Sequence, residues 1–141
     1  MRHRKANAQL GRPTDQRLAM LRELACGVIY SGKIDTTVVR AKATRPYLER
    51  LVTKAVRGRR LEEAASHVSD EAEAQRLRAQ AVHLRRQVRT KLQRPEAVKA
   101  LFDEVAPRFM ERPGGYTRIV RTGFRRGDGA ETAQLRWVES A

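Results

Sequence analysis

The sequence has little of what a membrane protein, a secreted protein or a metalloprotein needs. Only 5% of its 141 residues are aromatic. It contains no apolar run of about eighteen residues, and its first residues lead into no apolar signal core. A single cysteine, Cys26, excludes an internal disulfide and does not suggest a zinc site. We therefore expect a cytoplasmic, unexported protein with no membrane attachment and no cofactor.

Local signatures of catalysis are also missing. The sequence holds no Walker phosphate-binding pattern, no His-Glu-x-x-His motif and no Cys-x-x-Cys motif. His3, His67 and His83 lack ligand-like spacing to Cys26, so we expect no metal site. Cys26 itself lies between apolar positions of a helical pattern, which favours core packing over a nucleophile. We expect a protein that is not an enzyme and has no small-molecule substrate.

Positive charge is what the sequence has in excess. Thirty Lys and Arg stand against 16 Asp and Glu, which leaves a net charge of +14. The surplus lies in residues 1–60 and 105–141, whereas residues 61–104 carry equal numbers of acids and bases. Such a surplus indicates a polyanionic partner. A membrane surface would require an apolar face rich in large side chains, so nucleic acid is the main candidate.

Residues 1–13 predict an extended basic arm that becomes ordered only on its partner. They contain no acid and no periodic apolar pattern. A flexible terminus with chance charges is the alternative. The candidate RNA-binding residues of this arm are Arg2, His3, Arg4, Lys5 and Arg12.

Residues 14–139 predict a single α+β domain with several helices and a small three-stranded sheet. A helix with Thr14 as a possible N-cap should stop near Gly32, where glycine readily adopts the left-handed conformation. Residues 33–37 form a short candidate strand. A second helix, capped by Thr36 or Thr37, should reach about Val56 and be followed by Gly58. Within that helix, Pro46 predicts a kink or a break near Arg45, and we expect the kink.

The middle and C-terminal parts predict further helices and a hairpin. Residues 60–93 suit either one long amphipathic helix or two helices broken near Ser69 and Asp70. Pro95 suits the first turn of another helix, which should end before Pro107. Residues 116–122 and 132–138 alternate like strands, and the glycine-rich stretch between them predicts a flexible basic tip. Residues 33–37 could complete the sheet.

The C-terminal stretch 112–118 places two glycines and a tyrosine between two arginines, a combination that suits folded RNA. Arginine forks match phosphate oxygens and tyrosine can stack on a base, although a plain turn explains the glycines equally well. Further arginines in the same hairpin, Arg136 among them, favour RNA. The candidate RNA-binding residues here are Arg112, Gly114, Gly115, Tyr116, Arg118, Arg121, Arg125 and Arg126.

Cations in and before the second predicted helix form the last candidate group. Lys33, Lys42 and Arg45 are predicted to bind RNA. Others in the same helix, including Arg40, Arg50 and Lys54, either line a groove or merely face water. Helical spacing alone leaves both possibilities open.

Several ordered stretches resemble one known family. Met-Arg-His-Arg-Lys-Ala-Asn at residues 1–7, followed by Leu-Gly-Arg at 10–12, resembles the start of bacterial large-subunit ribosomal protein seventeen. Lys-Ile-Asp-Thr-Thr at 33–37, before Ala-Lys at 41–42 and Arg-Pro at 45–46, is similar to the strand-to-helix junction of that family. Since the resemblance begins at the first residue, we expect no transit peptide.

The C-terminal half carries the most distinctive resemblance. It comprises Phe-Asp-Glu-Val-Ala-Pro-Arg at 102–108, Arg-Pro-Gly-Gly-Tyr-Thr-Arg at 112–118 and Arg-Arg-Gly-Asp-Gly at 125–129. Residues 59–94 depart from the family because they look longer than its usual connection and lack its Gly-Asp-Leu-His stretch. We expect them to form an enlarged helical insertion on the solvent side, since the balance of acids and bases in residues 61–104 gives little gain from burial in rRNA.

The resemblance implies a structural constituent of the large ribosomal subunit, located in the cytoplasm as part of the ribosome. It implies an α+β domain packed on large-subunit rRNA near the peptide exit, with the arm reaching between RNA helices. Neighbouring large-subunit ribosomal proteins would be the protein contacts. Two rivals remain: a DNA-binding or nucleoid protein, which would share the charge, and a nucleic-acid enzyme, for which no convincing set of acids is present.

Overall fold

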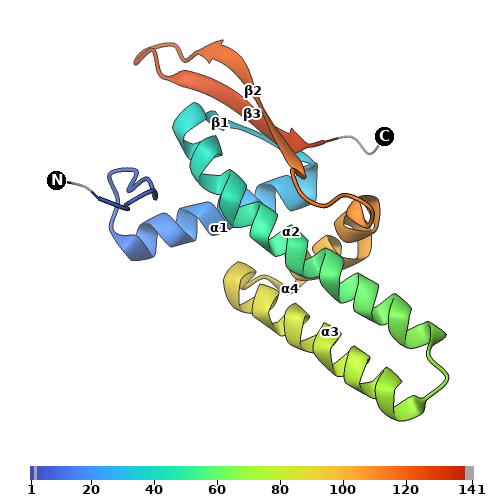
Figure 1. The fold of residues 1–141 in the computed structure, drawn as a ribbon. Helices are drawn as coiled ribbons and strands as arrows, with labels where there is room; N and C mark the ends of the chain where they lie inside the picture. Colours follow the sequence, from blue (N-terminus) through green and yellow to red (C-terminus); the bar gives the residue numbers. More distant parts are fainter. Residues whose placement is uncertain (2, 139–141) are drawn as a thin grey trace.

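The computed structural model describes residues 1 and 3–138, so the predicted RNA-binding residue Arg2 lies outside the described residues. Helices pack on a three-stranded sheet (Figure 1), which confirms the predicted α+β fold class. In chain order the elements are α1 (Thr14–Ser31), β1 (Lys33–Thr37), α2 (Val38–His67), α3 (Glu71–Leu92), α4 (Pro95–Ala100), η1 (Leu101–Val105), η2 (Ala106–Phe109), β2 (Thr117–Phe124) and β3 (Glu131–Trp137).

Helix α1 ends where the sequence predicts. Gly32 adopts a left-handed conformation with φ of 80°, and its N–H donates to the carbonyl of Val28 at 2.8 Å. Both features close a helix at little steric cost because glycine has no Cβ. The predicted N-cap is wrong, since Thr14 is already helical and Pro13 precedes the helix.

Helix α2 is longer than predicted. It begins at the predicted cap, where the Oγ1 of Thr37 accepts from the backbone N–H of Arg40 at 3.4 Å. The predicted end near Val56 and the possible break at Pro46 are wrong, because the helix continues for 30 residues. A proline removes only one helical N–H, and burial of Leu48 and Val52 just beyond it stabilises continued helix.

Gly58 serves packing rather than helix termination. It is buried within α2, and a Cβ at this position would lie 2.9 Å from the Cε1 atom of Phe102. Phe102 is itself only 1% exposed and comes from η1. The aromatic ring therefore occupies the volume that a larger residue in α2 would need.

The middle segment forms a helical hairpin, as the second of the two predicted alternatives has it. Helix α2 ends at His67, and α3 begins after Asp70, whose carboxylate accepts from the N–H of Ala72 at 3.1 Å. The two helices lie side by side along most of α3 (Figure 1). Ala65, Ala74 and Ala81 are buried along them, and such small side chains permit close helix packing.

The segment after α3 stays helical further than expected. Pro95 occupies the first turn of α4, as predicted. The predicted end before Pro107 is wrong, since α4 continues as a π-helical turn and then a 3₁₀ turn that reaches Phe109. Pro107 lies in the first turn of that 3₁₀ helix.

The three predicted strands form one antiparallel sheet in the order β1-β3-β2. Ile34, Leu135 and Ile119 stand opposite one another, and Leu135 is fully buried between the other two. Helix α2 contacts the sheet and α3, which lie on different sides of it (Figure 1).

Three aromatic rings pack together beside the sheet. The ring centroid of Phe109 lies 5.3 Å from that of Tyr116 and 5.7 Å from that of Trp137. These rings extend the core from the sheet to η2.

We predict that Gly58→Ala destabilises the protein by about 1–3 kcal/mol, because the new methyl group overpacks the core against Phe102. The free energy of unfolding from urea titration measures this. The double variant Gly58→Ala with Phe102→Leu should lose less than the sum of the two single losses. Stabilisation by about 1 kcal/mol in the single variant, the usual result for glycine replaced inside a helix, would contradict the packing role.

Candidate nucleic-acid interface

The described part of the arm is exposed but not extended away from the domain. His3, Arg4, Lys5 and Arg12 are exposed, and residues 3–12 form no helix or strand. Figure 1 shows this segment curling back beside the start of α1, where residues 6–8 line a hollow together with α1 and α2. The prediction of an extended arm concerns the protein bound to RNA, and both the extension and the contact with RNA stay predictions.

Three predicted or noted cations meet in one row across the sheet. Lys33 of β1 stands opposite Arg136 of β3, which stands opposite Arg118 of β2. Residues directly opposite in a sheet point to the same face, and all three of these residues are exposed. We call Lys33, Arg118 and Arg136 the cationic row. Like charges placed opposite one another destabilise a sheet, so this row suits an anion.

One acid lies next to the cationic row on the same face, and no ion pair between it and the row is found within the described residues. Asp35 lies two residues along β1 and accepts a hydrogen bond from the Nε2 of Gln134 at 3.3 Å. Sequence alone could not reveal the row, because it depends on strand order and register. Arg136 was visible as one of several hairpin arginines but not as the centre of three aligned cations.

The hairpin tip holds arginines of two kinds. Arg121 pairs with Glu131 at 2.8 Å, and Arg125 binds Asp128 through two hydrogen bonds, one of them 3.0 Å long from Nε to Oδ1. Those two guanidinium groups are thus already partly neutralised within the hairpin. Arg126 is exposed, and no ion pair to it is found within the described residues. It is the tip cation most available to a partner.

The exposed aromatic of this region is Phe124 rather than Tyr116. Tyr116 is 3% exposed and packs edge-on against Phe109, so its ring has no free face for the base stacking that we expected. Phe124 is 76% exposed at the end of β2 and stands opposite Glu131. Sequence reasoning missed Phe124, although an aromatic next to Arg125 and Arg126 was a visible signal.

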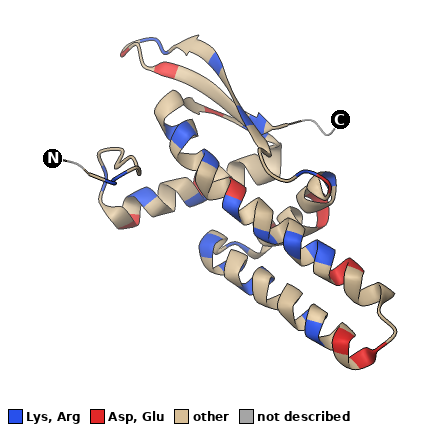
Figure 2. Ribbon diagram, in the orientation of Figure 1, with Lys and Arg blue, Asp and Glu red and all other residues tan. Residues whose placement is uncertain are grey.

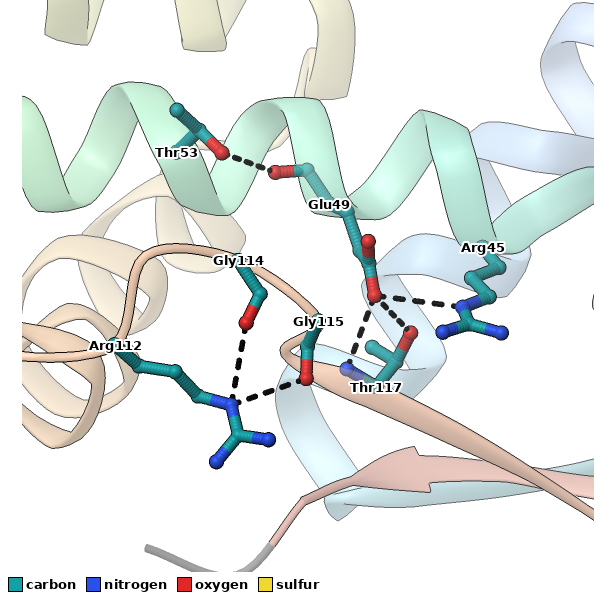
Figure 3. Close-up of polar contacts among 7 residues, drawn as sticks. All are labelled: Arg45, Glu49, Thr53, Arg112, Gly114, Gly115 and Thr117. Carbon is teal, nitrogen blue, oxygen red and sulfur yellow. Dashed lines mark hydrogen bonds and ion pairs between the residues drawn. The ribbon is translucent and has the colours of Figure 1, made fainter.

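The glycine-rich stretch before β2 is a folded turn held by its own arginine. The Nε of Arg112 donates to the carbonyls of Gly114 and Gly115, both at 3.2 Å (Figure 3). Gly115 has φ of 62°, a conformation that L side chains rarely adopt. Arg112 therefore shapes the turn. The residue is exposed, so a partner can still reach its guanidinium group.

Glu49 joins α2 to the start of β2. Its Oε1 accepts from the backbone N–H of Thr117 at 3.1 Å and from the Thr117 hydroxyl at 2.8 Å (Figure 3). The predicted site residue Arg45 also contacts this carboxylate, at 3.5 Å. Arg45 is thereby placed in a structural ion pair on α2, which orients the strand that carries Arg118.

Charge is segregated along the helical hairpin (Figure 2). Acidic residues gather around the turn between α2 and α3, at Glu62, Glu63, Asp70, Glu71 and Glu73. Most cations of the hairpin lie nearer to the body of the domain (Figure 2). The equal count of acids and bases in residues 61–104 therefore does not mean an even distribution.

Among the described residues, neither an activated cysteine nor a cluster of metal ligands is found. Cys26 is 2% exposed in the core, and burial, followed by the nearby Glu23, raises the pKa of its thiol, which disfavours the reactive thiolate. Among residues 1 and 3–138, no group of three or more His, Cys, Asp or Glu could hold a metal ion. No helix of that part is long and apolar enough to cross a membrane.

Exposed cations on a sheet face and a hairpin, with no ion pair found for several of them within the described residues, suit a polyanionic partner. Comparison with known proteins defines the class further, since residues 20–138 match the family model for ribosomal protein L17. The chain belongs to the ribosomal protein L17 family. That family is structural and not enzymatic, which confirms the predicted lack of catalysis and supports a structural role in the large ribosomal subunit.

Individual relatives agree with this family over most of the chain. A protein of Gemmatimonas aurantiaca named large ribosomal subunit protein bL17 is 46% identical over 99% of this chain and 100% of its own length. Proteins with the same name from Clostridium acetobutylicum and Kosmotoga olearia are 47% and 40% identical, over 92% and 99% of this chain and 95% of their own lengths. The similarity to the last of these spans the middle segment.

We predict that Glu49→Gln destabilises the protein by about 1–3 kcal/mol, because a neutral amide is a weaker acceptor for the two donors of Thr117. Chemical denaturation and amide hydrogen exchange at Thr117 measure the loss. Glu62→Gln is the matched control, since Glu62 pairs with Arg59 on the same helix, both side chains are partly exposed, and such pairs contribute little. Equal effects of the two substitutions would show that Glu49 does not join α2 to β2.

We predict that the hairpin tip keeps its structure on acidification to pH 3.8, the ordinary pKa of an aspartate. The hydrogen bond from Arg125, followed by the one from the N–H of Ala130, holds the pKa of Asp128 well below that value. A carboxylate with a lowered pKa stabilises the fold at higher pH, and this contribution is lost only as pH falls through the lowered value.

The amide resonance of Ala130, followed by NMR from pH 7 downward, tests the Asp128 contact. It should remain unchanged until the pH is below 3.8. A transition centred at or above that pH, absent from Asp128→Asn, would contradict the contact.

Proposed function

We propose that this protein is a structural constituent of the large ribosomal subunit that binds rRNA through the basic arm and the C-terminal hairpin. It would act in the cytoplasm as part of the ribosome. The observation that carries the proposal is the cationic row. It places three aligned positive charges on one exposed sheet face, where the free protein gains nothing from them. Phosphates neutralise such a row and release their counterions.

The arm and the hairpin tip extend this interface. Arm cations bind phosphates of rRNA, and the arm straightens between RNA helices at an entropic cost that new contacts offset. At the tip, Arg126 contacts a phosphate and Phe124 stacks on an unpaired base. The proposed RNA-binding residues are Arg2, His3, Arg4, Lys5, Arg12, Lys33, Lys42, Arg45, Arg112, Gly114, Gly115, Arg118, Arg121, Arg125, Arg126, Phe124 and Arg136.

The remaining expectations concern where the protein sits. We infer that residues 1–13 form the arm and residues 14–139 one rRNA-binding domain, with residues 59–94 as its helical insertion. The acidic end of that insertion faces away from rRNA, because carboxylates and phosphates repel each other. Neighbouring ribosomal proteins near the peptide exit are the proposed protein partners. The names of the relatives described above include the large ribosomal subunit, which supports placing this protein in that subunit.

The cationic row makes opposite predictions for RNA affinity and for stability. In the triple variant Lys33→Gln, Arg118→Gln and Arg136→Gln, affinity for deproteinised large-subunit rRNA should fall. The slope of log affinity against log salt should become shallower by about 2–3, as expected for three lost phosphate contacts. Unfolding free energy of the free protein should stay equal or rise by about 0.2–1 kcal/mol, because like-charge repulsion is relieved.

Arg78→Gln is the control, since Arg78 lies on α3 outside the proposed RNA-binding residues and already pairs with Glu71. It should change the salt slope by clearly less than one third of the triple effect. If the triple variant binds rRNA like the wild type, the cationic row is not an RNA contact. If it unfolds more readily, the row serves the fold instead.

Deletion of residues 2–12 tests the arm. We predict that the shortened protein folds, because its core lies outside these residues, but enters the large subunit poorly in competition with the full chain. Mass spectrometry of subunits from cells that express both forms gives the ratio. Equal incorporation of the two forms would show that the arm is dispensable for assembly.

A further inference from the structure

Two adjoining hollows lie along α2. One is bounded by residues 6–8 of the arm, α1 and the first half of α2, and the other by α1, α2 and the end of α3. Leu18, Tyr47 and Arg50 line both hollows, so the two lie side by side. We call the two hollows together the α2 trough. It lies apart from the cationic row, which is on the exposed face of the sheet.

The α2 trough is lined by cations with no acid among the described residues that line it. Four of these cations lie on α2 at intervals of eight, four and three residues, which places them along one face of the helix. Repulsion between like charges at such spacing is unfavourable in the free protein. The cations that line the α2 trough are Arg17, Lys42, Arg50, Lys54, Arg57 and Lys91.

Two acids of the surrounding helices are bound outside the trough. Glu49, next to Arg50 in sequence, accepts both hydrogen bonds from Thr117 on the sheet side of α2. Glu23 of α1 binds Arg94 at 2.7 and 2.8 Å. Tertiary contacts thus turn these carboxylates away and leave the trough uniformly positive.

The floor of the α2 trough is apolar and partly fixed. Leu18 is 43% exposed, which is high for a leucine in a hollow. The hydroxyl of Tyr47 donates to the carbonyl of Lys91 at 2.7 Å, which connects α2 to the end of α3. Side chains of this kind can lie under the sugar or base of a nucleotide while flanking cations bind its phosphates.

We propose that the α2 trough holds a segment of rRNA backbone that continues from the arm, as an interface additional to the sheet face and hairpin. This rests on the proposed function and extends it to two separate RNA contacts on one small domain. Charge complementarity indicates a polyanion, and RNA is favoured over an acidic protein segment because the trough adjoins the basic arm, which is itself proposed to bind rRNA. The protein then bridges two rRNA segments and neutralises both.

A matched pair of triple variants tests the α2 trough. Arg50→Gln, Lys54→Gln and Arg57→Gln remove three trough cations, whereas Arg76→Gln, Arg86→Gln and Lys99→Gln remove three exposed cations from α3 and α4. Binding to deproteinised large-subunit rRNA is measured over a range of salt concentrations. The trough variant should show a slope shallower by about 2–3 than the wild type, and the control variant a nearly unchanged one.

Equal changes of the salt slope in the two variants would contradict rRNA binding in the trough, because the loss of net charge alone would then explain both. If the wild type itself fails to bind rRNA, the proposed function falls as well. If the trough variant binds rRNA normally but loses a crosslink to a neighbouring protein, the occupant is protein and the proposal is wrong.

Directed cleavage locates the occupant. An iron chelate attached at Thr53→Cys would stand in the α2 trough, and one at Thr90→Cys would stand on exposed α3. Each threonine hydroxyl donates to a backbone carbonyl one turn earlier in its own helix, so its replacement should disturb little. Cys26 is buried and should remain unlabelled. Strand cleavage of bound rRNA is expected from position 53 and not from position 90. Normal rRNA binding without cleavage from position 53 would overturn the proposal.

Discussion

The rest of the structure depends on the burial of α2 on more than one side. Leu48, Val52 and Ala55 are fully buried, and α2 packs against the sheet and against α3, which lie on different sides of it. Burial of apolar area is the main stabilising term in a domain of this size. A cationic side chain cannot enter these contacts without a partner, so the α2 cations are confined to the helix faces that remain. The fold thus fixes where positive charge is displayed.

Several acids are bound to partners within the fold. Glu49 and Glu23 are held by Thr117 and Arg94, and Asp128 binds Arg125, so these carboxylates stabilise turns and junctions rather than neutralising the exposed cations. The charge that results is unfavourable for the free protein but favourable beside phosphates, because neutralised RNA segments can approach one another more closely. A structural role in the ribosome follows from this imbalance together with family membership.

Part of the fold was predictable from the sequence because it depends on local chemistry. The stop of α1 at Gly32 and the cap at Thr37 depend on neighbouring residues only, and both were predicted. Gly58 was misread as a helix end, because the ring of Phe102 that requires a glycine there comes from a distant part of the chain. Tyr116 was misread for a related reason, since only the contact with Phe109 shows that its ring is buried. The cationic row and the α2 trough require strand register and helix packing, which no local pattern specifies.

Sedimentation of tagged protein in a sucrose gradient of cell lysate, at moderate and at high salt, tests the central claim most directly. We predict stoichiometric protein in the large-subunit fraction at moderate salt, retained through a high-salt wash because many phosphate contacts act together. Absence from that fraction, or recovery with DNA instead, would contradict an integral role in the large ribosomal subunit and favour a nucleoid protein.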